Sequence, residues 1–304
     1  MIADARLVGT VLSGNIDDYP DGIIMPVDKP YRWTSADVVR KIKWAACHHF
    51  GKKNLKVGHA GTLDPLATGV LLVCIGKATR LAESLQKEGK EYVAGISFGA
   101  TTPSYDLEKA VDRLYPTDNV NEGSILEVLP GFLGEQDQVA PLFSAKSVDG
   151  VRAYELARKQ FRERGLAKTE VIEDFDHTVA ETLNVQRINI YGLELLSLRQ
   201  GLSGSAANAG RTQPQRSEDG LGRYLTASRP NPRINVADIS GIDLVQAEIR
   251  IACSKGTYIR ALARDLGEAL GSGAFLHSLR RTKSGGFDAE TALKISEAMD
   301  LLAT

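Results

Sequence analysis

The sequence is poor in cysteine and has no long apolar run. Its three cysteines, Cys47, Cys74 and Cys253, are far apart and odd in number, which indicates reduced thiols and excludes a disulfide framework. No apolar run approaches the length of a membrane span. Residues 1–6 also lack the basic and then apolar layout of a secretory signal. We therefore expect a cytoplasmic protein that does not contact a membrane.

Metal-ligand spacing is missing as well. Cys47, His48 and His49 are consecutive, so their side chains would point in different directions from a helix. No second pair of ligand residues stands at the spacing of a metal site. We expect no bound metal.

Excess positive charge is the third absence. The 37 basic and 38 acidic residues give a net charge of −1, whereas proteins that bind nucleic acid are usually basic. Local basic clusters still allow binding to nucleic acid, because clustered cations can contact phosphates. The clusters are Arg40, Lys41 and Lys43; Lys52, Lys53 and Lys56; and Arg280, Arg281 and Lys283.

The most informative stretch is residues 58–70, GHAGTLDPLATGV. Its glycines permit positive φ or a close backbone approach, and Pro65 restricts Asp64 to extended geometry. The apolar run 71–75 that follows suits a buried strand. The stretch therefore predicts a loop that presents one carboxylate at the edge of a packed core. The alternative is a tight turn in which Asp64 caps a helix.

The remaining pattern mixes strands and helices in a chain long enough for one large or two small domains. Residues 23–29, 90–99, 186–198 and 245–252 are apolar or alternate as strands do. Helices are expected from Thr34 or Ser35, either of which can cap, over 121–134 up to a closing glycine, over 261–270 and over 293–302. Residues 199–234 are rich in Gly, Ser, Arg and Pro and predict a flexible insertion.

Together these motifs resemble the TruB family of tRNA pseudouridine synthases, over roughly residues 22–286. Residues 58–70 match the family's catalytic loop almost letter for letter. Residues 138–158, 253–260 and 275–282 match further family segments in the expected order. Residues 100–106 depart from the family: Pro103 and Ser104 replace an acid and a threonine, while Asp106 is kept.

The resemblance implies an α+β pseudouridine synthase fold, with a central mixed, mostly antiparallel sheet flanked by helices. It divides the chain into an extension (1–21), a catalytic domain (22–286) and a tail (287–304) in which the family's PUA-like domain is expected to be absent. Within the catalytic domain it implies a thumb-like insertion at about 136–165 that clasps RNA.

The resemblance also implies the site residues. Asp64 would be the reactive carboxylate, Arg260 would hold it ionised by a two-pronged hydrogen bond, and Tyr92 would stack on the target base. Tyr258 and Leu279 would hold the extracted ring, and His59 would fill the place the base leaves. Lys29 could touch either the RNA or the aspartate loop. Phosphate contacts are expected from Lys146, Arg152 and Arg158.

The activity implied is isomerisation of uridine to pseudouridine in the T loop of tRNA, at position 55, by a monomer that needs no cofactor. Asp64 has no second acid in the motifs, as a paired-carboxylate hydrolase requires. It could attack C1′, attack C6 of the base or assist removal of the 2′ proton, and the sequence does not choose among these routes. Two rivals stay open: a synthase acting on ribosomal or messenger RNA, and a chaperone that folds tRNA without catalysis.

Overall fold

A computed structural model describes residues 3–4, 12–141, 147–148, 151–152, 185–200, 231–232 and 234–303. The chain forms two compact units. The first comprises Met1–Tyr92, Pro214–Ile234 and Arg280–Thr304, and the second comprises Val93–Gln213 and Asn235–Leu279. Two strands, β5 (Lys90–Phe98) and β13 (Ala274–Ser284), carry the chain from one unit to the other. No helix among the described residues is long and apolar enough to cross a membrane.

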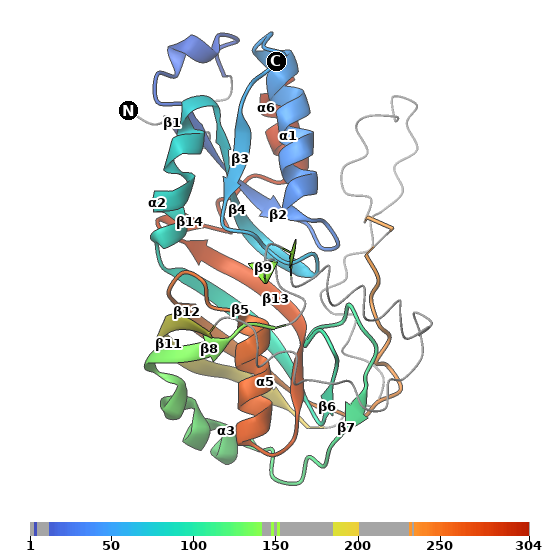
Figure 1. The fold of residues 1–304 in the computed structure, drawn as a ribbon. Coiled ribbons are helices and arrows are strands. Elements are labelled where there is room, and N and C mark those ends of the chain that lie inside the picture. The colour runs from blue at the N-terminus through green and yellow to red at the C-terminus, as the bar shows by residue number, and fades with distance from the viewer. Residues whose placement is uncertain are drawn as a thin grey trace. The chain divides into compact units, whose positions relative to one another are not determined.

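The first unit is built on a mixed sheet (Figure 1). Strand β2 (Ile23–Lys29) pairs in parallel with β1 (Ala3–Asp4) and antiparallel with β4 (Ala67–Ile75). Strand β3 (Val57–Ala60) also pairs antiparallel with β4, and β14 (Phe287–Asp288) with the end of β13. The helices are α1 (Ser35–His49), α2 (Ala82–Lys87) and α6 (Ile295–Leu301), with short 3₁₀ turns at Ile16–Asp18 and Gly76–Leu81.

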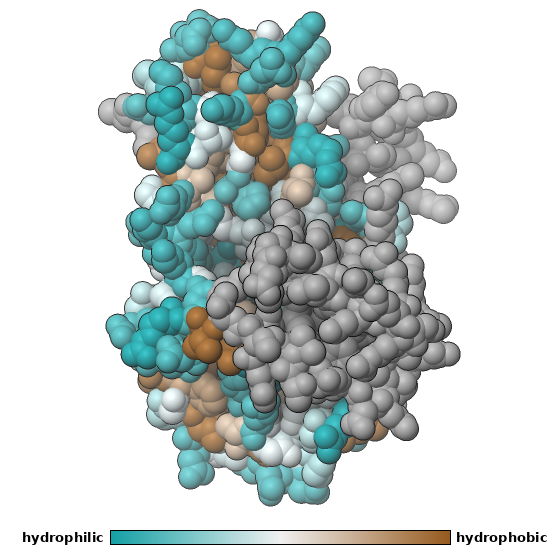
Figure 2. Space-filling model, viewed as in Figure 1, coloured by the Kyte–Doolittle hydropathy of each residue, from teal (hydrophilic) through white to brown (hydrophobic). Residues whose placement is uncertain are grey.

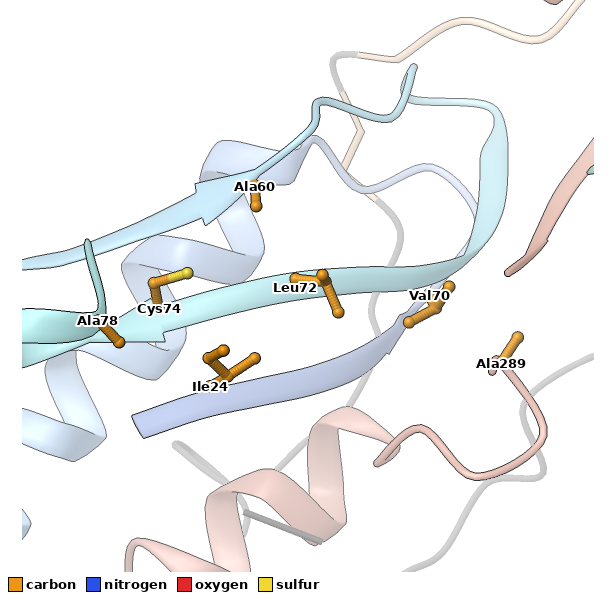
Figure 3. Packing of buried hydrophobic residues seen from close by; sticks show 7 residues of the cluster. All are labelled: Ile24, Ala60, Val70, Leu72, Cys74, Ala78 and Ala289. Atoms are coloured by element: carbon orange, nitrogen blue, oxygen red, sulfur yellow. The ribbon is translucent and has the colours of Figure 1, made fainter. Parts of the chain in front are cut away.

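Strand β4 forms the centre of this unit's core, because nearly all of its residues are buried. Its alternate residues Val70, Leu72 and Cys74 share one face, as the two-residue period of a strand requires. Figure 3 shows them beside Ala60 of β3 and Ile24 of β2, in one apolar cluster. The buried strand predicted after the aspartate loop is thus confirmed, and it anchors the loop at one end.

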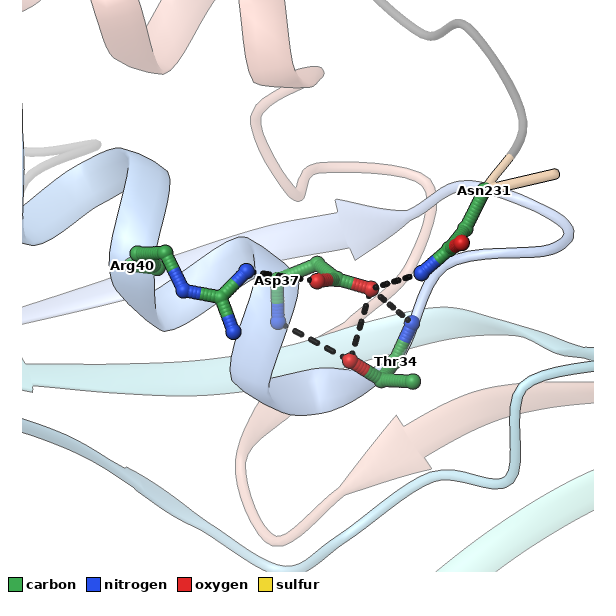
Figure 4. Close-up of polar contacts among 4 residues, drawn as sticks. All are labelled: Thr34, Asp37, Arg40 and Asn231. Atoms are coloured by element: carbon green, nitrogen blue, oxygen red, sulfur yellow. Dashed lines mark hydrogen bonds and ion pairs between the residues drawn. The ribbon is translucent and has the colours of Figure 1, made fainter. Parts of the chain in front are cut away.

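Helix α1 begins with a capping box between Thr34 and Asp37 (Figure 4). The Thr34 hydroxyl accepts a hydrogen bond from the Asp37 amide at 3.0 Å, and the Asp37 carboxylate accepts one from the Thr34 amide at 3.0 Å. Such caps are typically worth about 1 kcal/mol. Of the two hydroxyls that could cap this helix, Thr34 therefore does so, which leaves Ser35 available for another contact.

The second unit contains an antiparallel sheet in which β11 (Val185–Arg199) lies between β8 (Gly134–Val139) and β12 (Val245–Cys253). Strands β6 (Ala100–Thr101) and β7 (Arg113–Leu114) form a small pair, as do β9 (Ser147–Val148) and β10 (Val151–Arg152). Helix α5 spans Ile259–Ala269. The helix expected over 121–134 is shorter: α3 covers Glu122–Val128 and a 3₁₀ turn covers Leu129–Phe132, because Pro130 cannot donate a helical hydrogen bond.

The mixture of sheets and helices in both units confirms the predicted α+β class. Most of the flexible insertion and most of the thumb-like insertion fall outside the described residues. Figure 2 shows hydrophilic residues over much of the face in view, with hydrophobic residues in small groups between them.

A polar chain runs through the second unit. His277 Nδ1 and Ser97 Oγ are hydrogen-bonded at 3.0 Å, and Gln246 Nε2 lies 3.5 Å from the same Ser97 oxygen. Gln246 donates to the Ser97 oxygen, whose own proton stays available for Nδ1 of an uncharged imidazole. Burial, aided by the positive charge of Arg199, lowers the pKa of His277 to about 4. Burial and the Arg199 charge therefore favour neutral His277.

This pKa predicts a loss of stability in mild acid. Between pH 6.5 and about 4 the unfolded chain binds a proton that the folded chain does not, so the unfolding free energy should fall as the pH falls, by about 1.4 kcal/mol per pH unit. His277→Gln should flatten this part of the profile, measured by urea unfolding at several pH values. His48→Gln, at an exposed histidine, should leave it unchanged. Parallel profiles for wild type and His277→Gln would contradict the assignment.

Candidate active site

The Asp64 loop joins β3 to β4 within the first unit. Its strands are paired antiparallel, with His59 opposite Val73, and the Ala67 amide donates to the Asp64 carbonyl at 3.1 Å to close a tight turn. Asp64 itself is half-buried. The loop therefore presents its carboxylate from a turn closed by its own backbone, as the sequence predicts.

Ser35 fixes the residue before Asp64. Its hydroxyl accepts a hydrogen bond from the Leu63 amide at 2.9 Å and lies 3.1 Å from the Leu63 carbonyl, to which it donates. Both Ser35 and Leu63 are buried. Because Ser35 is the first residue of α1, the helix start and the aspartate loop are held together directly.

Lys29 holds the residue after Asp64. Its ammonium group donates to the carbonyl oxygens of Trp33 at 2.5 Å, Pro30 at 3.0 Å and Pro65 at 3.3 Å, so three acceptors match its three protons. Burial lowers the pKa of Lys29 to about 7, although the negative charge of Asp64 opposes the shift. The side chain is 0% exposed. Of the two contacts expected for Lys29, the structure shows the one with the loop.

Arg281 on β13 holds the two ends of the loop. Its guanidinium donates to the Val70 carbonyl from Nε at 2.8 Å and to the Gly61 carbonyl from Nη2 at 3.1 Å. A β-carbon on Gly69, whose φ is +101°, would lie 2.1 Å from the Arg281 carbonyl oxygen. Glycine is therefore required where β4 passes the Arg281 backbone.

These contacts correct, for Arg281, the phosphate role expected of the third basic cluster. Arg281 is 1% exposed and cannot reach an RNA phosphate. Arg280 forms a two-pronged pair with Asp28, at 3.0 and 3.1 Å, and Lys283 lies 3.6 Å from Glu91. The three residues of the cluster are basic, but their side chains bind carbonyl and carboxylate groups of the protein itself.

His59 and Tyr92 belong to the same unit. Among the described residues, the buried Nδ1 of His59 has no hydrogen-bond partner. Burial lowers the pKa of His59, and the nearby charge of Arg281 lowers it further, so its ring is uncharged at neutral pH. Tyr92 on β5 is 8% exposed. Both side chains are flat and neutral, which suits contact with a base.

Arg260 lies in the second unit at the start of α5 and is 4% exposed. Its Nη1 donates to the Ser104 carbonyl at 3.1 Å, and its Nε lies 3.8 Å from an Asp106 oxygen. The other Asp106 oxygen accepts from the Ser104 hydroxyl at 2.6 Å. Sequence reasoning noted that Asp106 was kept but missed it as a partner of Arg260. The pairing of Arg260 with Asp64 stays a prediction.

Tyr258 is held by a residue that sequence reasoning also missed. The buried amide of Gln138 on β8 accepts from the Tyr258 amide at 2.8 Å and donates to its carbonyl at 3.2 Å. The Tyr258 ring and Leu279 are each half-buried. Of the remaining candidates, Lys146 and Arg158 lie outside the described residues, and Arg152 is described only as part of strand β10.

Comparison with family models matches two parts of the chain. Residues 48–200 match the TruB family pseudouridylate synthase N-terminal domain, and residues 260–304 match the tRNA pseudouridylate synthase B C-terminal domain. The chain is 40% identical to tRNA pseudouridine synthase B of Phocaeicola vulgatus, over 91% of this chain and 92% of that one. It is 42% identical to the protein of that name from Bacteroides thetaiotaomicron, over 91% of each.

Two solved structures share the fold. One is a chain of an H/ACA ribonucleoprotein bound to a substrate RNA containing 2′-deoxyuridine, with a TM-score of 0.51, 24% identity and 92% of this chain covered. The other is a chain of a Cbf5–Nop10–Gar1 complex, with a TM-score of 0.50, 26% identity and 90% covered. The chain spans about half the length of these two, 53% and 52%.

The contacts of the Asp64 loop predict that substituting Arg281 destabilises the protein more than substituting the neighbouring Arg280. Arg281→Lys keeps the charge but replaces two separate donor nitrogens, Nε and Nη2, by a single one. One buried carbonyl should then lose its donor, and the unfolding free energy should fall by about 1–3 kcal/mol. Hydrogen exchange of the loop amides at 61–66 should also rise. The matched control, Arg280→Lys, alters a partly exposed ion pair worth about 1 kcal/mol or less. Equal losses in the two variants would contradict a special role for Arg281.

Proposed function

This chain belongs to the TruB family of pseudouridine synthases and isomerises uridine to pseudouridine in tRNA; we propose that its target is the T-loop uridine at position 55 and that Asp64 carries the reaction. The observation that supports this most is the Asp64 loop, whose backbone is held by Ser35, Lys29 and Arg281. Such preorganisation keeps a reactive carboxylate in position without help from the substrate.

The reaction is an exchange of bonds within one nucleotide. The bond from C1′ to N1 of uracil breaks, the base turns, and a bond from C1′ to C5 forms; the C5 hydrogen leaves as a proton and N1 gains one. Asp64 begins this exchange as a carboxylate, by attack at C1′ or C6 or by assisting removal of the 2′ proton. Arg260 keeps Asp64 ionised. The guanidinium of Arg260 is buried and already lies beside one carboxylate, that of Asp106.

The base is reached by flipping the uridine out of the RNA. Tyr92 and Tyr258 stack on the extracted ring and Leu279 packs against it, while neutral His59 takes the place that the base leaves. Flipping costs a few kcal/mol, which the new stacking offsets. The Gln138 clamp supports this role for Tyr258, because it fixes the backbone from which the ring projects.

The RNA partner is the T arm of tRNA, with Lys146, Arg152 and Arg158 on its phosphates. The enzyme works as a monomer in the cytoplasm. A chaperone that only binds and folds tRNA would have no use for a carboxylate held this firmly, so the structure favours catalysis. The chaperone activity and action on another RNA remain alternatives that the tests below separate.

Asp64→Asn should abolish tritium release from tRNA labelled at uridine C5, because an amide cannot act as a nucleophile or base at this step. The affinity for tRNA should stay within about tenfold, or 1.4 kcal/mol. Asp17→Asn, at an exposed carboxylate, is the matched control and should turn over normally. Substantial turnover by pure Asp64→Asn enzyme would contradict the catalytic role of Asp64.

Recognition by loop shape predicts that the isolated T-arm hairpin is a substrate. Proteins read RNA sequence mainly in loops whose bases can be splayed and stacked. Turnover should therefore be seen with whole tRNA and with the hairpin, and lost when the hairpin's loop is scrambled. Equal rates on the scrambled loop would refute this proposal. No turnover on the intact hairpin would show that contacts outside the T arm are required.

A further inference from the structure

A cavity of about 490 Å³ lies in the first unit beside helix α1 and is separate from the Asp64 loop. Its apolar wall is formed by Trp33, Trp44 and Met299 of α6, and Arg40 and Lys41 stand on its rim. Cavities of roughly 300–1,000 Å³ are the size that small-molecule ligands occupy. The proposed mechanism uses none of these residues, although Arg40 and Lys41 belong to the first basic cluster of the sequence.

The residues from α1 share one face of the helix. Positions 37, 40, 41 and 44 follow the three- and four-residue spacing that stacks side chains on one side, whereas Trp33 lies just before the helix. The floor is polar but already satisfied: Asp37 accepts from Thr34, from Arg40 at 2.8 Å and from Asn231 at 3.2 Å (Figure 4). Asp37 thus has its hydrogen-bond partners within the protein, and of these only Arg40 carries a charge.

The aromatic and basic groups both remain accessible. Trp44 is 60% exposed, which is unusual for tryptophan. The Arg40 side chain is 74% exposed although it pairs with Asp37, and such exposed pairs contribute little energy. The indole Nε1 of Trp33 is buried without a hydrogen-bond partner in the described part of the chain. A ligand acceptor that reached it would relieve this cost.

We propose that this cavity binds an unstacked nucleotide of RNA, with the base against the tryptophans and its phosphate on Arg40 and Lys41. Stacking on aromatic rings combined with nearby cations is how proteins hold single-stranded RNA. The proposal rests on the proposed function for its partner, a tRNA. No loop residue lines the cavity, but Trp33 is linked to the aspartate loop through Lys29, which donates to the carbonyls of both Trp33 and Pro65.

The chain offers a direct probe, because its only two tryptophans both line this cavity. AMP should quench tryptophan emission, adenosine should quench it more weakly, and inorganic phosphate alone should not. Unmodified tRNA should also quench it. Unchanged emission with both AMP and tRNA would overturn the proposal.

Variants extend the test to the enzyme. Trp44→Ala should weaken tRNA binding and raise KM by about tenfold with kcat unchanged, which is about 1.4 kcal/mol. Arg40→Gln should lower the slope of log affinity against log salt by about 1. The matched control is Tyr191→Ala, which removes another aromatic side chain that is 60% exposed, and it should bind tRNA as wild type does.

The outcomes separate this proposal from the proposed function. Normal turnover with no change in KM for Trp44→Ala, or equal weakening by Tyr191→Ala, overturns the nucleotide site and leaves the isomerase intact. Quenching by AMP and tRNA in a protein that releases no tritium supports the nucleotide site and overturns the proposed reaction.

Discussion

Two buried basic side chains hold the Asp64 loop of the first unit in place. Lys29 and Arg281 are removed from water, which is costly for a charge unless it is well hydrogen-bonded. Both meet that condition with backbone carbonyls of the loop and its flanks, at Pro65, Gly61 and Val70. The same bonds satisfy carbonyls that a tight loop would otherwise leave unpaired. Loop and cations therefore stabilise each other, and Asp64 sits between the points where they bind.

In the second unit, Arg260 and Tyr258 are also held by polar contacts with other parts of the chain. Arg260 lies against Asp106 and the Ser104 carbonyl, and Tyr258 is fixed through its backbone by Gln138. The departure from the family at Ser104 is accommodated, because the serine hydroxyl donates to Asp106 and its carbonyl accepts from Arg260. In each unit, then, a candidate site residue is positioned by polar groups that do not themselves react.

Local features of the fold could be predicted from the sequence, and distant contacts could not. The strands, the start of α1 and the aspartate loop follow from periodicity, capping residues and glycine placement, which are short-range signals. The Arg281 contacts join residues 211 and 220 positions apart, and the Gln138 clamp spans 120. No local pattern marks such partners. The length of α3 was predicted wrongly, because the prediction followed the apolar spacing and did not allow for Pro130, before which the helix ends.

The surface charge could not be predicted from the sequence, because the sequence does not show which basic residues are buried. The sequence counts 37 basic residues, but Lys29, Lys90, Arg260 and Arg281 are all buried and bind groups of the protein itself. The cluster 280–283 therefore gives less positive surface than its sequence predicts, because Arg281 is buried and Arg280 and Lys283 are paired with carboxylates. The cations left for RNA are fewer than the composition implies. Phosphate contacts alone would then supply less of the affinity, and the stacking proposed for rings such as Trp44 and Tyr258 would supply a larger share.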